Sequence, residues 1–248
     1  MVLNSYSKIN LSLSVNNKLK NRLHEIQSYF CLIGLSDKIL VRKILKKKDK
    51  ISFKGQFARH VKISNNSISN LLKLLRKLNL ISSYYSVVVT KNIPVFAGLG
   101  GGTSNAAFLL KFLMKNKISE SLLKKVEKLI GSDLRLFFYR QGFLKNLQNI
   151  VSAKKNQKLY FLLAHPNVKC STYEIYSKVK KYSRKKKLNF NKINTKSKFI
   201  DYIFNNKNEL QSIVEKKYPI VKKLLTDISF ERGCYFSRMS GSGSVCYG

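Results

Sequence analysis

Apolar and polar residues alternate near the N-terminal end of the chain, in the segment KINLSLSV. Ile9, Leu11, Leu13 and Val15 are apolar, and polar residues separate them. Because the side chains of a strand point alternately to its two faces, this pattern predicts a half-buried strand over residues 8–15. The segments DKILVRKI, QFARHVKIS and YYSVVVTK predict further strands.

A different spacing follows in the segment NSISNLLKLLRKLNLI. Apolar residues from Ile68 to Leu78 recur on one face of a helix, and Asn66 or Ser67 can cap its first turn. The segment TSNAAFLLKFLMK predicts a second helix with Thr103 or Ser104 as its cap. A third helix is expected over about 119–130.

The second half of the chain also mixes helices and strands. KLYFLLAHP predicts a strand, STYEIYSKVKKY a capped helix, and residues 199–229 two amphipathic helices. The last segment, CYFSRMSGSGSVCYG, predicts a strand, a glycine turn and a strand. The fold class that follows is α+β in two lobes, 1–152 and 153–248.

The composition narrows the class of protein. With 248 residues, 44% of them hydrophobic, the chain can bury a core, and no apolar run approaches the length of a membrane span. The N-terminal segment lacks the apolar core of a signal peptide, so we expect a cytoplasmic protein without a membrane partner. The four cysteines and three histidines show no metal-ligand spacing, so no metal site built from them is expected.

The charge is extreme: 48 Lys and Arg stand against 12 Asp and Glu, a formal net charge of +36. Clustered cations favour nucleic-acid binding. Lysine is spread through almost every segment here, however, whereas a nucleic-acid site is a patch. We therefore expect no specific nucleic-acid partner, although a basic nucleic-acid-binding protein stays an alternative.

One loop carries no charge at all. The segment PVFAGLGGGTSNAA, residues 94–107, holds four glycines between a predicted strand and a predicted helix. It fits neither the P-loop nor the dinucleotide-binding pattern. Glycines still let backbone N–H groups approach a phosphate, and the N-terminus of a helix favours an anion. A phosphate cradle with the Thr103 and Ser104 hydroxyls as added donors is the favoured interpretation, and a flexible turn before a capped helix is the alternative.

Two further residue types suit a reaction at such a cradle. Asp133 is an isolated carboxylate among apolar neighbours in GSDLRLFF, where it is either a turn residue or a general base that takes a hydroxyl proton. Lys8 is a candidate for neutralising the charge that develops during phosphoryl transfer. A second small-residue turn, MSGSGS, is a candidate for closing over the same ligand.

Taken together, SKINLSLSV, KNIPVFAGLGGGTSNAA, GSDLRLFF and MSGSGS resemble the motif set of the GHMP small-molecule kinases, in order and over nearly the whole chain. The resemblance implies a two-lobed fold with an N-terminal α/β lobe, a strand–glycine loop–helix phosphate site and a ferredoxin-like C-terminal lobe, which we expect to be shortened at its end in this chain. It implies transfer of the γ-phosphoryl group of ATP, with Mg²⁺, to the 2-hydroxyl of a methylerythritol linked to cytidine diphosphate, a step of the non-mevalonate route to isoprenoid precursors. A monomer or homodimer is expected, and another GHMP kinase, acting on mevalonate derivatives or homoserine, is an alternative.

The same resemblance assigns residues by motif position. Lys8 corresponds to the active-site lysine and Asp133 to the catalytic base. The implied ATP-binding residues are Pro94, Val95, Phe96, Ala97, Gly98, Leu99, Gly100, Gly101, Gly102, Thr103, Ser104, Lys91 and Asn66. The implied substrate-binding residues are Asn10, His24, Thr172, Tyr176, Gly241 and Ser242, with His24 near the cytosine and Tyr176 as the ring that stacks on it.

Three positions depart from the family pattern. Phe96 stands where the family usually has glycine, and we expect it to need a negative φ or a local adjustment of the loop. Arg135 stands where a proline usually follows the aspartate, and Leu23 replaces a tyrosine, which removes one ring from the implied cytidine pocket.

Overall fold

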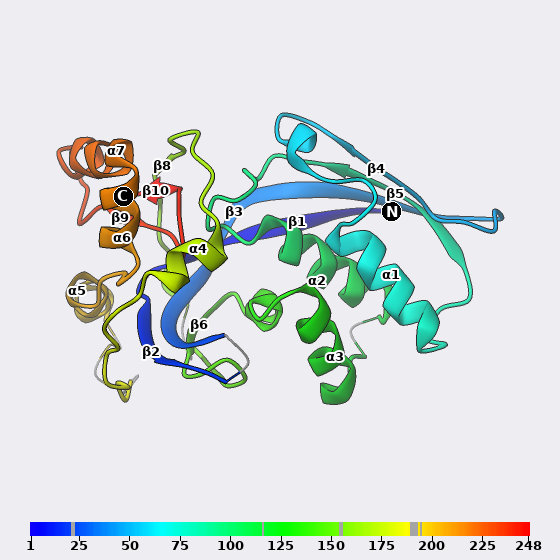
Figure 1. Ribbon diagram of the computed structural model, residues 1–248, viewed down its shortest axis with the longest axis horizontal. Helices are drawn as coiled ribbons and strands as arrows, with labels where there is room; N and C mark the ends of the chain where they lie inside the picture. Colours follow the sequence, from blue (N-terminus) through cyan, green and yellow to red (C-terminus); the bar gives the residue numbers. More distant parts are fainter. Residues whose placement is uncertain (21–22, 116, 154–155, 189–192, 194) are drawn as a thin grey trace. The chain divides into compact units, whose positions relative to one another are not determined.

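The computed structural model describes residues 1–248 except 21–22, 116, 154–155, 189–192 and 194 (Figure 1). Two compact units make up the chain. Unit 1 consists of Met1–Lys8, Leu32–Val95 and Gly100–Phe138; unit 2 consists of Ile9–Cys31, Phe96–Leu99 and Tyr139–Gly248. These units interleave along the sequence, whereas the expected lobes 1–152 and 153–248 are consecutive, and that division of the chain stays a prediction.

Unit 1 contains a β-sheet whose central strand is β3 (His24–Ile44), of which residues 32–44 belong to this unit. β5 (Tyr84–Thr90) pairs with it antiparallel, from Lys38 opposite Thr90 to Ile44 opposite Tyr84. β4 (Lys50–Lys54) pairs with β5 in parallel, and β1 (Val2–Asn10) pairs with β3. The strands are rich in β-branched residues, as a pleated and half-buried surface favours.

Helices pack on this sheet and form the core of unit 1. They are α1 (Ser67–Lys77), α2 (Gly101–Leu113) and α3 (Glu120–Ile130), followed by the 3₁₀ helix η2 (Leu134–Phe138). Figure 1 shows α1, α2 and α3 on the same side of β3 and β5. Their apolar faces and the strand residues facing them form one buried cluster, which includes Ile39, Val89, Leu71, Leu109 and Val126. Packing against the sheet and the other helices therefore fixes the position of α2, the helix that follows the glycine loop.

The described residues of unit 2 form short strands and four α-helices. β2 (Ser14–Lys18) and β6 (Gln141–Leu144) pair with the first part of β3, and β7 (Ile150–Ser152) pairs with β6. A second sheet has the order β8-β10-β9, with β8 at Leu163–Ala164, β9 at Arg238–Met239 and β10 at Cys246–Tyr247. The helices are α4 (Thr172–Ser177), α5 (Lys196–Asn205), α6 (Gln211–Lys217) and α7 (Pro219–Ser229).

The α+β class and most predicted elements are confirmed, and three local predictions are wrong. The strand over 8–15 is two strands, since β1 ends at Asn10 and β2 begins at Ser14; its apolar side chains are buried all the same. Within QFARHVKIS the structure has a 3₁₀ helix, η1 (Ala58–His60), because this segment follows a turn and has no ladder partner. Residues 199–229 carry parts of three helices, since Pro219 begins α7 directly after α6.

No helix in the described ranges is both long and apolar enough to cross a membrane.

Candidate active site

The Lys8 side chain lies between the glycine loop and Asp133 in unit 1. Its exposed fraction is 4%, and its Nζ is 3.4 Å from Oδ2 of Asp133, whose side chain is 36% exposed. A Cβ built on Gly100 would lie 3.4 Å from Cε of Lys8. The structure thus brings together the two residues and the loop that the sequence singled out, with a buried cation paired to a carboxylate that water can reach.

Asp133 is held in place by the residues that follow it. Leu134 and Phe137 of η2 are buried in the core of unit 1. Arg135 is buried as well, and its guanidinium donates four hydrogen bonds, of 2.8 to 3.1 Å, to Glu120 and Glu127 of α3. Bidentate pairs of this kind are both strong and directional. Arg135, which departs from the family's proline, therefore ties the turn that bears Asp133 to α3.

The start of α2 carries no side-chain cap. Gly100, with φ +70°, is its N-cap residue, and no acidic residue lies in the first turn. The predicted cap by Thr103 or Ser104 is wrong because the helix begins earlier, and Ser104 lies inside it on a buried face. A helix N-terminus whose N–H groups have no capping side chain is suited to an anion.

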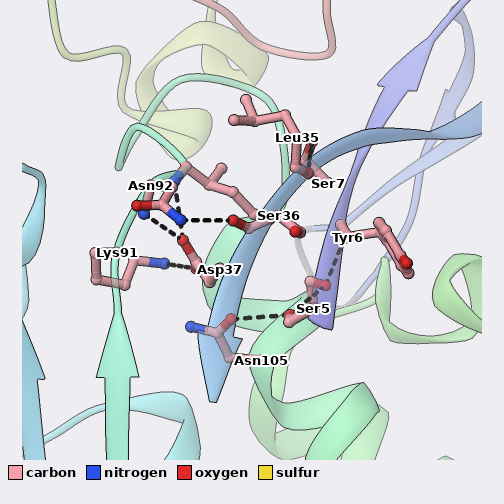
Figure 2. Close-up of polar contacts among 11 residues, drawn as sticks. Ser5, Tyr6, Ser7, Leu35, Ser36, Asp37, Lys91, Asn92 and Asn105 are labelled. Carbon is pink, nitrogen blue, oxygen red and sulfur yellow. Dashed lines mark hydrogen bonds and ion pairs between the residues drawn. The ribbon is translucent and has the colours of Figure 1, made fainter. Parts of the chain in front are cut away.

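Ser104 bonds to β1 instead. Its hydroxyl donates to the carbonyl oxygen of Tyr6 at 2.6 Å and lies 2.7 Å from the hydroxyl of Ser5. Ser5 also donates to Oδ1 of Asn105 at 2.9 Å, a contact that Figure 2 shows. Thr103 lies beside the turn before Asp133, because its Oγ1 would be 3.6 Å from a Cβ on Gly131. Of the two hydroxyls, that of Thr103 is the one placed near the carboxylate, and that of Ser104 is used in fixing α2 to β1.

Asn66 and Lys91, the two predicted ATP-binding residues outside the glycine loop, both bind other residues of unit 1. Asn66 caps α1, as predicted, and its side chain accepts from the N–H of Ser69 at 2.9 Å. Lys91 is buried at the end of β5 and pairs with Asp37 of β3. Burial lowers the pKa of Lys91, and the charge of Asp37 acts against that shift. Sequence reasoning missed Asp37; its one signal is an acidic residue directly before an apolar strand in a chain with few acids.

The first part of the loop, Phe96–Leu99, belongs to unit 2, where Ala97 and Leu99 are buried. Phe96 has φ +58° and is 56% exposed. Of the two alternatives expected there, a negative φ is wrong: the backbone at Phe96 has the left-handed conformation that glycine adopts readily, and the ring is largely exposed to solvent. Pro94 and Val95 precede this part and belong to unit 1.

The MSGSGS turn packs against that part of the loop within unit 2. A Cβ on Gly98 would lie 2.1 Å from the carbonyl oxygen of Ser240, and the Ser240 hydroxyl donates to the Gly98 carbonyl at 3.1 Å. The N–H of Val245 donates to Ala97 at 3.1 Å. The two small-residue segments that were paired on sequence are therefore in direct contact, and Gly98, with φ +77°, admits no side chain there.

The other predicted substrate residues of unit 2 lie around the same turn. Asn10 is buried; its side chain donates to Ser28 at 2.8 Å and its N–H to Ser240 at 3.3 Å. The hydroxyls of Thr172 and Ser242 are 2.9 Å apart. Gly241 is buried within the turn with φ +55°.

His24 and Tyr176 come together in unit 2, as the resemblance implies. Their ring centroids are 5.0 Å apart, with planes 31° from parallel. A third ring, Tyr182, lies 6.3 Å from His24 at 25° and was not foreseen. Burial and the charge of Lys18 lower the pKa of His24, so the imidazole is neutral near pH 7. A neutral ring beside two phenols is a surface on which a flat, uncharged base can stack.

A cavity of about 590 Å³ lies elsewhere in unit 2, between α5, α7 and residues 159–162. None of the predicted site residues lines it, so we do not place the chemistry there.

Known protein families and solved structures share this fold. The family of the GHMP kinases N terminal domain matches residues 66–133, from the cap of α1 to Asp133. A solved structure, the crystal structure of 4-(cytidine 5'-diphospho)-2C-methyl-D-erythritol kinase, superposes with a TM-score of 0.73 at 22% identity, covering 100% of this chain and 89% of that one. The fold of this chain is therefore that of the GHMP small-molecule kinases.

Curated relatives narrow the family further. The 4-diphosphocytidyl-2-C-methyl-D-erythritol kinase of Pelagibacter ubique (strain HTCC1062) is 38% identical over 97% of this chain and 85% of the relative. The kinase of the same name from Anaplasma marginale (strain Florida) is 30% identical over 99% of this chain and 86% of the relative. The chain belongs to the family of 4-diphosphocytidyl-2-C-methyl-D-erythritol kinases, and ATP use follows from that membership.

Proposed function

We propose that this chain transfers the γ-phosphoryl group of ATP to the 2-hydroxyl of 4-diphosphocytidyl-2-C-methyl-D-erythritol. The observation that carries the proposal is the position of Lys8, whose ammonium pairs with Asp133 at 3.4 Å and whose stem lies against Gly100. A carboxylate, a cation and a helix N-terminus at one point are the groups that phosphoryl transfer to an alcohol needs.

Each group has a distinct role in this mechanism. Asp133 orients the acceptor hydroxyl and takes its proton as the bond to phosphorus forms. The ammonium of Lys8 stabilises the negative charge on the transferred group. The N–H groups at the start of α2 bind the phosphates of ATP, which Gly100, Gly101 and Gly102 allow to approach the backbone.

Magnesium fits the residues present. No cluster of three or more His, Cys, Asp or Glu that could hold a metal occurs among the described residues. Mg²⁺ is bound mostly through substrate phosphates and water, with one or two protein ligands, and so needs no such cluster. The Thr103 hydroxyl, which lies beside the turn before Asp133, is the protein group that would hold it, and the bound ion would neutralise charge on the phosphates.

Recognition of the cytidyl group is assigned to unit 2. His24 and Tyr176 provide adjacent rings for the base, and Tyr182 supplies a further ring in a pocket that has Leu23 instead of the family's tyrosine. The serine and threonine hydroxyls of Ser242 and Thr172 are donors for the diphosphate.

A substrate panel tests the proposal. The purified chain is incubated with labelled ATP, Mg²⁺ and, separately, the cytidyl-linked methylerythritol, mevalonate, phosphomevalonate and homoserine. Phosphorylation of the cytidyl compound alone is expected. Preference for another acceptor would assign a sister activity, and RNA binding at physiological salt without any phosphorylation would favour the nucleic-acid-binding alternative.

A further inference from the structure

Asp37 is a fully buried carboxylate. Its exposed fraction is 0%. In the described part of the chain its partners are Lys91, Asn92 and Ile93, the residues that lead from β5 into the glycine loop. Oδ1 accepts the N–H groups of Asn92 at 2.8 Å and Ile93 at 2.9 Å, and Oδ2 pairs with the ammonium of Lys91. Figure 2 shows Asp37 projecting from its strand toward Lys91 and Asn92, whose own side chain donates to the carbonyl of Ser36 at 3.0 Å.

Burying an ion pair such as Lys91 and Asp37 costs free energy unless hydrogen bonds and the opposite charge stabilise both ions. Two ions leave water, and a pair of this kind often contributes little net stability compared with apolar residues of similar size. The three hydrogen bonds to Asp37 are charge-assisted and directional, and therefore fix the backbone of Asn92 and Ile93 more tightly than apolar packing would. What the pair provides is a defined geometry at the point where β5 becomes the glycine loop.

Lys91 and Ile93 also lie next to Gly101, the first residue of α2. A Cβ built on Gly101 would lie 3.3 Å from Nζ of Lys91 and 3.0 Å from the side chain of Ile93. Two of the three residues that Asp37 binds are thus the ones beneath the N-terminus of α2. A lysine ammonium and a helix N-terminus are both positive, and the charge of Asp37 allows the two to lie together in the absence of a bound anion.

We propose that Asp37 is a positioning residue of the nucleotide site. It holds Lys91, Asn92 and Ile93 in place, so that the N-terminus of α2 is preorganised for the phosphates of ATP. Asp37 itself does not touch the nucleotide. The inference rests on the proposed function in one respect, namely that the glycine loop binds ATP, and it does not depend on which alcohol is phosphorylated.

The chain offers a matched control at the other end of β5. Asp49 accepts the N–H of Tyr85 at 2.9 Å and pairs with Arg76 at 3.1 Å, and its side chain is 14% exposed. Asp37→Asn and Asp49→Asn each replace one carboxylate that anchors β5, so both lose stability. Only Asp37 contacts the residues beneath α2, and therefore only Asp37→Asn is expected to weaken nucleotide binding.

The experiment measures binding of a non-hydrolysable ATP analogue with Mg²⁺ by calorimetry, together with melting temperature and the KM values for ATP and acceptor. We expect Asp37→Asn to raise the Kd and the KM for ATP by about tenfold while the KM for the acceptor is unchanged, and Asp49→Asn to leave all three unchanged. Equal effects of the two variants on ATP affinity would overturn the proposal, because Asp37 would then act on stability alone.

A second variant covers the case in which Asp37→Asn does not fold. The double variant Asp37→Asn, Lys91→Gln removes both charges, leaves no unpaired buried ion, and is expected to fold with weakened analogue binding. Wild-type affinity in the double variant would overturn the proposal. A wild-type chain that binds the analogue but phosphorylates a different acceptor refutes only the proposed substrate, whereas one that binds no analogue refutes both.

Discussion

Gly102 is the residue at which the fold and the proposed phosphate site make opposite demands. It is the second residue of α2, is exposed, and has no positive φ. A Cβ there would meet nothing closer than the Ser67 hydroxyl at 3.7 Å, an ordinary contact. Gly102→Ala should therefore stabilise the fold by about 0.4–1 kcal/mol, because alanine loses less backbone entropy in a helix than glycine. For a chain of this size that corresponds to a rise in Tm of about 1–4 °C.

Nucleotide binding should change in the other direction. If phosphate oxygens lie against the N–H groups at this end of α2, the added methyl group occupies space that the ligand needs. Steric conflict of one methyl group in a well-packed site costs about 1–3 kcal/mol. The KM for ATP should then rise by about 5- to 150-fold, with the KM for the acceptor much less affected.

Gly34→Ala is the matched control for this variant. Gly34 is also in unit 1, is exposed on β3, and a Cβ there would meet nothing within 4 Å. Melting temperatures and the KM for ATP are measured for the wild type and both variants. Gly102→Ala with raised Tm and unchanged KM for ATP would refute the phosphate cradle at this position and would favour the alternative of a plain turn before a helix.

Other substitutions test the remaining parts of the site. Asp133→Asn should lower kcat by about 10²–10⁴-fold and leave calorimetric binding of an ATP analogue unchanged; turnover like that of the wild type would remove Asp133 from the mechanism. Phe96→Gly should raise the free energy of unfolding, measured by urea denaturation, by up to about 1 kcal/mol, because the strain of a left-handed phenylalanine exceeds the entropy cost of glycine. A decrease would show that the exposed ring packs against the protein. Arg135→Ala should destabilise the fold by about 2 kcal/mol at pH 7, since Glu127 is left with little access to water. Hydrogen bonds from Arg135 lower the pKa of Glu120 in the folded state. The stability that the Arg135–Glu120 pair contributes is therefore present above the unfolded-state pKa of glutamate and is lost as pH falls through the lower folded-state pKa, so the difference in stability between wild type and variant should shrink in acid.

Local sequence signals were sufficient for the elements around the glycine loop. The apolar spacing from Ile68 to Leu75 and the Asn66 cap describe α1 as the structure has it. The β-branched run that forms β5 and the glycine loop before α2 were also found, because each is encoded by neighbouring residues. The start of α2 is not predicted correctly, because hydroxyl residues near a helix start normally cap it, whereas Ser104 bonds to β1.

Long-range partners could not be predicted in the same way. Asp37 and Lys91 are 54 positions apart in sequence, and nothing in either segment indicates that the two charges are buried together. Arg135 looked like a departure from the family pattern, and its role depends on two glutamates of α3. Tyr182 looked like one residue of a basic segment, and only the tertiary structure places its ring beside His24.

The scarcity of acidic residues gives these contacts a common physical basis. In a chain of net charge +36, an isolated surface carboxylate has many cations nearby and no particular partner. The carboxylates of Asp37, Asp49 and Glu127 instead have defined partners and little exposure, so their interactions are screened less by salt than those of the surface lysines. Asp133 differs from these three, because its side chain is 36% exposed beside a lysine that is 4% exposed. A carboxylate that solvent can reach, held against a buried cation, is poorly suited to stabilising a fold and well suited to meeting an incoming hydroxyl group.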